Sequence, residues 1–184
     1  MEISMELPMN RYWFLTATSY GTRLPGDTRG FVSNVDDHQG GHVRHNEVWQ
    51  PFDEDHPGLN DHARSMMAGP AIYFTREQAE SILEQFQETA LYRGWQLLAV
   101  AIMTDHVHIV VGVLGDPDPD TLHRDFKSYA SRRLNQQWGK PPSETWWTKG
   151  GSKRKLKDLE AIREKIAYVR SQPNPLVIWV AEGW

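Results

Sequence analysis

Two apolar runs separated by only two residues constrain the fold more than any other feature of the chain. The runs are "WQLLAVAIM" (95–103) and "HVHIVVGVL" (106–114), and "TD" joins them. Short apolar runs rich in β-branched residues predict strands, and so short a connection predicts a hairpin. The first run is apolar at odd and even positions, which is typical of a strand covered on both faces. We therefore expect a buried antiparallel hairpin at the centre of a sheet.

Two histidines, His106 and His108, interrupt the second run. Because residues i and i+2 of a strand point to the same face, both imidazoles project side by side and Val107 turns away. Paired neutral imidazoles on a rigid strand are suited to binding one metal ion. A pair of hydrogen-bonded histidines in the sheet is the alternative, and the spacing alone does not choose. Val110 stands where a histidine-triad hydrolase needs its third histidine, and the His-x-Thr/Ser motifs of two-histidine phosphoesterases are absent here.

Further elements flank the hairpin along the chain. "YWFLTATSY" (12–20) predicts a strand. "TREQ" (75–78) predicts a capping box that begins a helix, and Gly94 ends that helix. Asp118 predicts the cap of another helix, which runs to about Trp138. These elements alternate in a way that favours helices packed on an antiparallel sheet.

The C-terminal part adds a loop (139–151), a helix (158–171) and a last strand (175–180). Together the elements predict one α+β domain over residues 1–184. We expect a ferredoxin-like or RRM-like antiparallel sheet with helices mainly on one face and the two histidines on a central strand. Residues 21–70 show no clear periodicity, so we expect a long functional loop or a disordered insertion there.

Composition excludes several classes of protein. The chain has 184 residues and no cysteine, which excludes disulfides and thiolate metal sites and is compatible with a reducing cytoplasm. No apolar run approaches the ~20 residues that span a bilayer. The N-terminus "MEISMELPMN" lacks the basic-then-apolar pattern of a signal peptide. We therefore expect a cytoplasmic protein without a membrane partner.

Charge is distributed unevenly along the chain, whose net charge is −4. Residues 124–165 contain twelve Lys or Arg and five Asp or Glu, so this basic segment carries +7 and the remainder carries −11. A chain polarised in this way can present a cationic surface to a polyanion while it stays acidic as a whole. The alternative is a solvated basic helix face.

The order of the motifs resembles that of a known family. The helix after the histidine strand contains "RDFKSYASRRLNQQW" (124–138), in which Tyr129 lies at the edge of an apolar stripe. A strand bearing HVH followed by such a helix is similar to the single-tyrosine HUH transposases, particularly the REP-associated tyrosine transposases. "GTRLPGDTRG" (21–30) resembles the loop after their first strand. "YVRSQPNP" (168–175) resembles their C-terminal segment, in which a Tyr precedes Asn-Pro.

The resemblance implies an enzyme that nicks and rejoins single-stranded DNA at imperfect hairpins such as repeated palindromes. His106 and His108 would bind Mg²⁺ or Mn²⁺, which polarises the scissile phosphodiester. Tyr129 would attack phosphorus and leave a 3′-hydroxyl and a 5′-phosphotyrosine, so that cleavage is reversible. These three residues are the expected catalytic set.

One position departs from the family pattern. Relatives often carry Asn or Gln one helical turn after the tyrosine as a third metal ligand, and this chain has Arg133 there. Asp125, one turn before Tyr129, and Asp105, beside the histidines, are the substitutes that the sequence offers. The third ligand therefore stays open.

The same resemblance makes single-stranded or hairpin DNA the expected partner. Seven cations of the basic segment are candidate DNA contacts: Lys127, Arg132, Arg133, Lys153, Arg154, Lys155 and Lys157. Trp146 and Trp147 are either stacking platforms for unpaired bases or core residues. An inactive relative would bind structured single-stranded DNA or RNA without cleaving it, and Arg133 favours this alternative. Relatives include monomers and homodimers, so the oligomeric state stays open.

Overall fold

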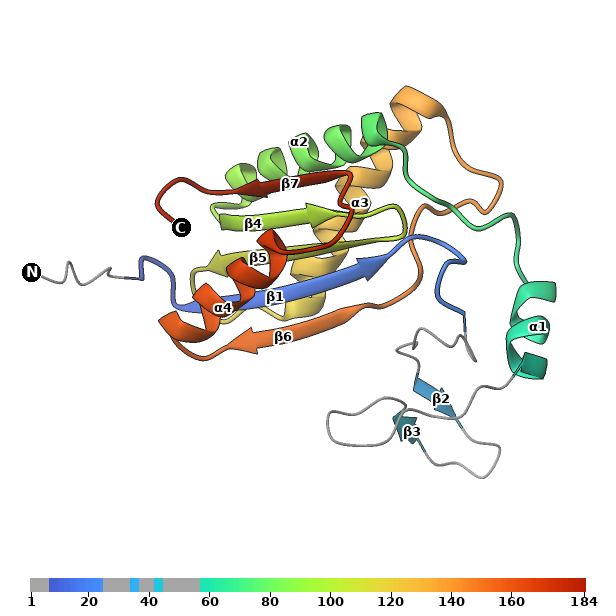
Figure 1. Ribbon diagram of the computed structural model, residues 1–184, viewed down its shortest axis with the longest axis horizontal. Coiled ribbons are helices and arrows are strands. Elements are labelled where there is room, and N and C mark those ends of the chain that lie inside the picture. The colour runs from blue at the N-terminus through green and yellow to red at the C-terminus, as the bar shows by residue number, and fades with distance from the viewer. Residues whose placement is uncertain (1–6, 25–33, 37–41, 45–56) are drawn as a thin grey trace, which may run out of the picture.

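A five-stranded antiparallel sheet organises the fold, with strand order β6-β1-β5-β4-β7 (Figure 1). This computed structural model describes residues 7–24, 34–36, 42–44 and 57–184. The strands of the sheet are β1 (Arg11–Thr18), β4 (Gln96–Ile102), β5 (His106–Val113), β6 (Ser152–Leu156) and β7 (Val177–Val180). No helix in the described ranges is both long and apolar enough to cross a membrane.

The predicted hairpin is formed by β4 and β5, and it occupies the middle of the sheet. The backbone N–H of Met103 donates to the carbonyl of His106 across the tight connection, at 2.8 Å. On its other side β5 pairs with β1, in a register that places Thr16 opposite His108 and Thr18 opposite His106. The two histidines therefore stand on a central strand, as the sequence predicts.

Helices α2 (Arg76–Arg93) and α3 (Pro119–Trp138) cover one face of the sheet (Figure 1). The capping box at the start of α2 is present, and Gly94 ends the helix in the left-handed region at φ 68°. Asp118 caps α3 by accepting from the N–H of Asp120. Both predicted helices are confirmed.

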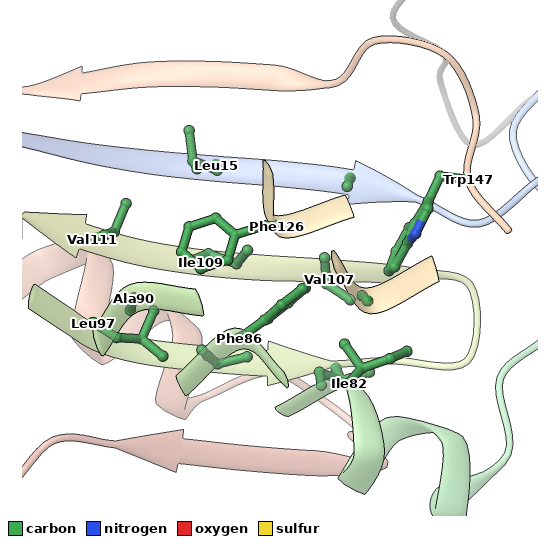
Figure 2. Close-up of a cluster of buried hydrophobic side chains, with 14 of the residues drawn as sticks. Leu15, Ile82, Phe86, Ala90, Leu97, Val107, Ile109, Val111, Phe126 and Trp147 are labelled. Carbon is green, nitrogen blue, oxygen red and sulfur yellow. The ribbon is translucent and has the colours of Figure 1, made fainter. Parts of the chain in front are cut away.

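The larger core lies between these helices and the sheet. Val107, Ile109 and Val111 point from β5 into it and meet Phe86 of α2 and Phe126 of α3 (Figure 2). The two phenylalanine rings pack edge to face with centroids 5.1 Å apart. This core uses every second residue of β5, which leaves the alternate residues for the other face.

Helix α4 (Leu159–Arg170) packs on that other face (Figure 1). Its buried residues Ile162, Ile166 and Val169 form a second, smaller core with Phe14 of β1 and Val110 of β5. The predicted α+β fold, with helices mainly on one face of an antiparallel sheet, is confirmed, and α4 is the helix that packs apart from α2 and α3.

Strand β6 was not predicted from the sequence. Its five residues "SKRKL" include only one buried side chain, Leu156, because β6 is an edge strand paired with β1 alone. Three consecutive cations conceal the alternation of faces that normally indicates a strand. Part of the basic segment is therefore a strand of the main sheet.

The segment 21–70 contains more structure than its composition predicts. Strands β2 (Asn34–Asp36) and β3 (His42–Arg44) pair with each other, and α1 (Pro57–Ser65) is a helix. "PGDTRG" (25–30) lies entirely outside the described residues.

Candidate active site

The paired histidines lie on the α4 face of the sheet. His106 and His108 point to the same side of β5, and their ring centroids are 4.8 Å apart. Phe14 stacks on the ring of His108 at 5.3 Å, and Tyr168 of α4 approaches the same ring at 5.4 Å. The alternation of β5 thus directs both imidazoles toward one helix.

Each imidazole is held through Nδ1. The Nδ1–H of His106 donates to Asp105 Oδ1 at 2.5 Å, and Arg23 contacts the other oxygen of that carboxylate at 3.3 Å. His108 Nδ1 is hydrogen-bonded to Thr16 Oγ1 at 3.0 Å. When Nδ1 carries the proton, Nε2 carries the lone pair that binds metals, and such outer partners fix both tautomer and ring orientation. The donor set therefore suits one divalent ion held by two Nε2 atoms.

His108 is neutral at physiological pH. Its pKa is lowered to about 3, chiefly because the ring is buried and further because His106, Lys165 and Arg23 place positive charge nearby. A neutral imidazole is the form that ligates a cation.

Tyr168 belongs to the same pocket. A cavity of about 290 Å³ is lined by both histidines and Tyr168, together with Thr16, Thr18, Arg23, Thr148, Lys149, Gly151 and Ser152. Lys165, one turn before Tyr168 on α4, places its ammonium 5.1 Å from the tyrosine ring and 5.3 Å from the ring of Phe14. A phenol, two imidazoles and several cations thus surround one small space.

Tyr129 does not lie in this pocket. It is on α3, whose apolar stripe packs against the opposite face of the sheet. Its ring contacts the guanidinium groups of Arg132 at 5.0 Å and Arg93 at 6.0 Å. Within one chain, therefore, the phenol of Tyr129 does not lie beside the histidines, because the sheet separates α3 from the α4 face.

The two predicted substitutes for a third ligand occupy different places. Asp125 is also on α3, where its carboxylate is buried and paired with Arg93 at 2.7 Å, so it does not reach the histidines. Asp105 is close to them but holds His106 Nδ1. No cluster of three His, Cys, Asp or Glu side chains suited to a metal occurs among the residues that the structure describes.

Gln172 offers an amide oxygen after the end of α4. It follows Tyr168 by four residues, and its Nε2 donates to the carbonyl of Tyr168 at 3.0 Å. This hydrogen bond uses the amide nitrogen and leaves the side-chain oxygen as an acceptor.

A segment that we call the strap, residues 147–151, forms one wall of the pocket. Lys127 of α3 holds it by donating from Nζ to the carbonyls of Thr148 at 2.5 Å and Gly150 at 3.0 Å. Gly151 has φ 142°, and a Cβ there would collide with the ring of His123 and the carbonyl of Thr16. The strap therefore depends on a lysine, a glycine and close packing against α3.

The other predicted DNA contacts have varied surroundings. Arg133 pairs with Glu84 at 2.6 Å and Glu88 at 2.9 Å on α2, and Lys153 pairs with Asp120 on α3. Arg132 stacks on Tyr129. The remaining three are exposed in or next to β6: Arg154, Lys155 and Lys157. Of these, Arg154 pairs across the sheet with Phe14 and shares its face, which is the face of the histidines.

Trp146 and Trp147 are both core residues. Trp146 is 6% exposed and Trp147 is 3% exposed. The indole N–H of Trp146 donates to Asn135 Oδ1 at 2.8 Å, and that of Trp147 donates to the carbonyl of Lys127 at 3.1 Å. Of the two predicted roles, base stacking and core packing, the structure supports core packing.

Tyr168 is not among the catalytic residues that the sequence predicts, although it lies in a segment that resembles the family. The available signal was "YVRSQPNP" itself, a tyrosine on the last turn of a helix followed by polar residues. What the sequence could not supply is the face of the sheet on which each helix packs.

The chain is similar to a known protein family and to solved structures of other proteins. The family model for "Transposase IS200 like" matches residues 71–169, more than half of the chain. A REP-associated tyrosine transposase bound to a REP hairpin aligns with a TM-score of 0.48 at 11% identity, over 92% of this chain and 70% of that one. A protein from Deinococcus radiodurans R1 assigned as a transposase aligns with a TM-score of 0.45 at 16% identity, over 92% and 95%. No curated protein matches the chain. On the family match, the chain belongs to the IS200-like transposases.

Proposed function

We propose that this transposase cleaves and rejoins single-stranded DNA, with Tyr168 as the nucleophile in the histidine pocket. The observation that carries the proposal is that Tyr168, His106 and His108 line one cavity, with the phenol ring 5.4 Å from the ring of His108. Tyr129 has no comparable surroundings, since its ring contacts two arginines on the far side of the sheet.

His106 and His108 would hold the divalent ion through Nε2, because Asp105 and Thr16 engage the Nδ1 atoms. Bound Mg²⁺ or Mn²⁺ would polarise the scissile phosphodiester and offset the charge that develops on its oxygens. Gln172 is the candidate third ligand, since it stands one turn after Tyr168 and its amide oxygen is an acceptor. With Tyr168 as nucleophile, the apparent departure at Arg133 no longer concerns the site.

The chemical step exchanges one phosphoester bond for another. Tyr168 Oη loses its proton to solvent and bonds to phosphorus, while the bond from phosphorus to the 3′ oxygen breaks. The departing oxygen takes a proton and becomes a 3′-hydroxyl, and the 5′ end stays attached to Tyr168. Lys165, whose ammonium lies 5.1 Å from the tyrosine ring, favours the negative charge that develops on the phenol oxygen and the phosphate. Reversal of the step rejoins the strand.

The pocket is suited to a single strand, which we propose crosses the edge of the sheet at β6. The pocket includes Ser152, the first residue of β6, and Lys149 of the strap. Arg154 continues a cationic path along the same face. Cations track phosphates without reading sequence, so this path would position the strand.

The test is to locate the covalent adduct. We expect denaturing gels of the full chain with single-stranded hairpin oligonucleotides and Mn²⁺ or Mg²⁺ to show a protein–DNA adduct that EDTA prevents. Mass spectrometry of the digested adduct should place the nucleotide on the peptide that contains Tyr168. An adduct on Tyr129 would overturn the assignment. Salt-sensitive binding with no adduct under either metal would instead identify a DNA-binding relative that does not cleave.

A further inference from the structure

A second and larger cavity lies on the other side of the strap. Its volume is about 810 Å³, and it is lined by residues of α1 and α3, residues 20–24 and the strap. Thr148 and Lys149 line both this cavity and the histidine pocket, so the two spaces share a wall. The family assignment and the proposed chemistry give this cavity no role.

The lining of the cavity combines an apolar surface with positive charge. Met66, Met67 and Leu24 contribute apolar side chains, and Ser128 and Ser131 contribute hydroxyl groups from α3. Methionine is a flexible and polarisable side chain that packs well against flat rings. The cavity therefore has one surface for a ring and polar groups at another.

The charge within the cavity is predominantly cationic. Arg124, Lys127 and Lys149 line it, and Asp120 is the acidic side chain among its lining residues. Asp120 is paired with Lys153. Lys127 donates to two backbone carbonyls, which do not neutralise its ammonium. A ligand that carries negative charge is therefore the complementary occupant.

We propose that this cavity binds an unpaired nucleotide of the DNA strand that is cleaved in the histidine pocket. The inference rests on the proposed function and extends it. A nucleotide matches both parts of the lining. Its base is a flat ring that can pack against the apolar side chains, and its phosphate is an anion that complements the cations. The volume lies within the usual range for ligand pockets, about 300–1,000 Å³.

The shared wall explains why the occupant belongs to the same strand. A DNA strand that leaves the histidine pocket past Lys149 next reaches Gly150. The space beside Gly150 is open, because a Cβ added at this residue would have no atom within 4 Å. The backbone of the strap is therefore open to a passing phosphodiester chain at this point. A neighbouring unpaired base is then carried directly into the second cavity, while paired bases of a duplex stem are excluded by their partners.

The experiment uses a fluorescent base that reports its surroundings. A series of oligo-dT strands of about 20 nucleotides each carries one 2-aminopurine at a different position. The fluorescence of this base and the affinity of the protein for each strand are measured without divalent metal. Ser131→Phe fills the cavity from α3, and Met66→Glu introduces a negative charge at an exposed residue of its rim. Gln136→Phe is the matched control, because Gln136 is an exposed residue of the same helix outside both cavities.

We expect binding to weaken about tenfold in Ser131→Phe and Met66→Glu, with loss of the 2-aminopurine signal, and to stay unchanged in Gln136→Phe. Equal binding by all four proteins, or equal loss in Gln136→Phe, overturns the proposal. An effect on melting temperature or oligomeric state alone, with DNA binding intact, overturns it too and assigns the cavity to protein contacts. Because no cleavage is measured, a missing adduct at Tyr168 contradicts the proposed function without deciding this test.

Discussion

The two faces of β5 differ sharply although they alternate along the same eight residues. Val107, Ile109 and Val111 enter the larger core, where α2 and α3 enclose them. His106 and His108 point the other way, toward α4 and a cavity. The first face therefore contributes only to the larger core, whereas the second combines the smaller core with the two histidines. The apolar half of β5 thus fixes the strand rigidly enough to hold two imidazoles in place.

The same difference between the two faces of the sheet separates two tyrosines, Tyr129 and Tyr168. Tyr129 is half-buried and Tyr168 is 43% exposed, and each lies on an amphipathic helix with cations nearby. They differ in the face that their helices cover, because α3 packs with α2 while α4 packs on the histidine side. In the proposed mechanism, proximity to His106 and His108, and not the local sequence, distinguishes Tyr168 from Tyr129.

The sharpest test of this comparison removes one hydroxyl from each face. Tyr168→Phe should reduce adduct formation on the order of 10³-fold or more, because the nucleophile itself is lost. Tyr129→Phe should retain the wild-type rate within about twofold, since a surface substitution away from the chemistry has little effect. The rates are measured as covalent complex formed per minute on one hairpin oligonucleotide.

Circular dichroism of both variants serves as the control for folding. If Tyr129→Phe abolishes the adduct while Tyr168→Phe keeps it, the roles of the two faces are exchanged. In that case Tyr129 of a second chain would have to reach His106 and His108.

A core substitution tests the apolar face. Phe126 is fully buried against Phe86, so Phe126→Ala should lower the free energy of unfolding by about 3–5 kcal/mol. Urea unfolding measures this loss. Adduct formation per folded molecule should be unchanged at low temperature, because Phe126 does not line the histidine pocket. A variant that stays folded but loses the adduct would mean that the two faces are coupled.

A smaller effect is expected at the partner of a histidine. Asp105→Asn keeps the size of the side chain but removes the carboxylate that accepts from His106 Nδ1. Loss of such an outer partner costs about 10–100-fold in metal affinity or activity. Titration with Mn²⁺ should therefore show weaker activation in this variant, with partial recovery at high Mn²⁺. An unchanged Mn²⁺ dependence would show that Asp105 does not orient the ring.

The sequence predicts the apolar face well and the polar face only in part. The β4–β5 hairpin, the capping box of α2 and the cap of α3 follow from short-range patterns, because their hydrogen bonds lie within a few residues. The projection of His106 and His108 to one side also follows from strand geometry alone.

Tyr168, the strap and β6 depend on contacts between distant parts of the chain. The pairing of Phe14 with Arg154 joins residues 140 positions apart, and nothing local in "SKRKL" indicates it. The role of Lys127 likewise depends on carbonyls of the strap more than twenty residues away. A lysine on a basic helix is typical of a DNA contact, and only the tertiary structure reveals two backbone acceptors.

Lys127 gives the smallest and most specific prediction, because it joins α3 on one face to the strap that borders the other. Burial, with a contribution from Lys153, lowers its pKa to about 8, whereas the pKa of an unfolded lysine is ~10.4. Between these values the unfolded chain binds more protons, so the contribution of Lys127 to the free energy of unfolding rises with pH across this window. Urea unfolding at about pH 7.5 and about pH 10 should therefore show the wild-type chain gaining stability relative to Lys127→Met. A difference between the two proteins that stays constant with pH would mean that this ammonium is as well solvated in the folded chain as in the unfolded one.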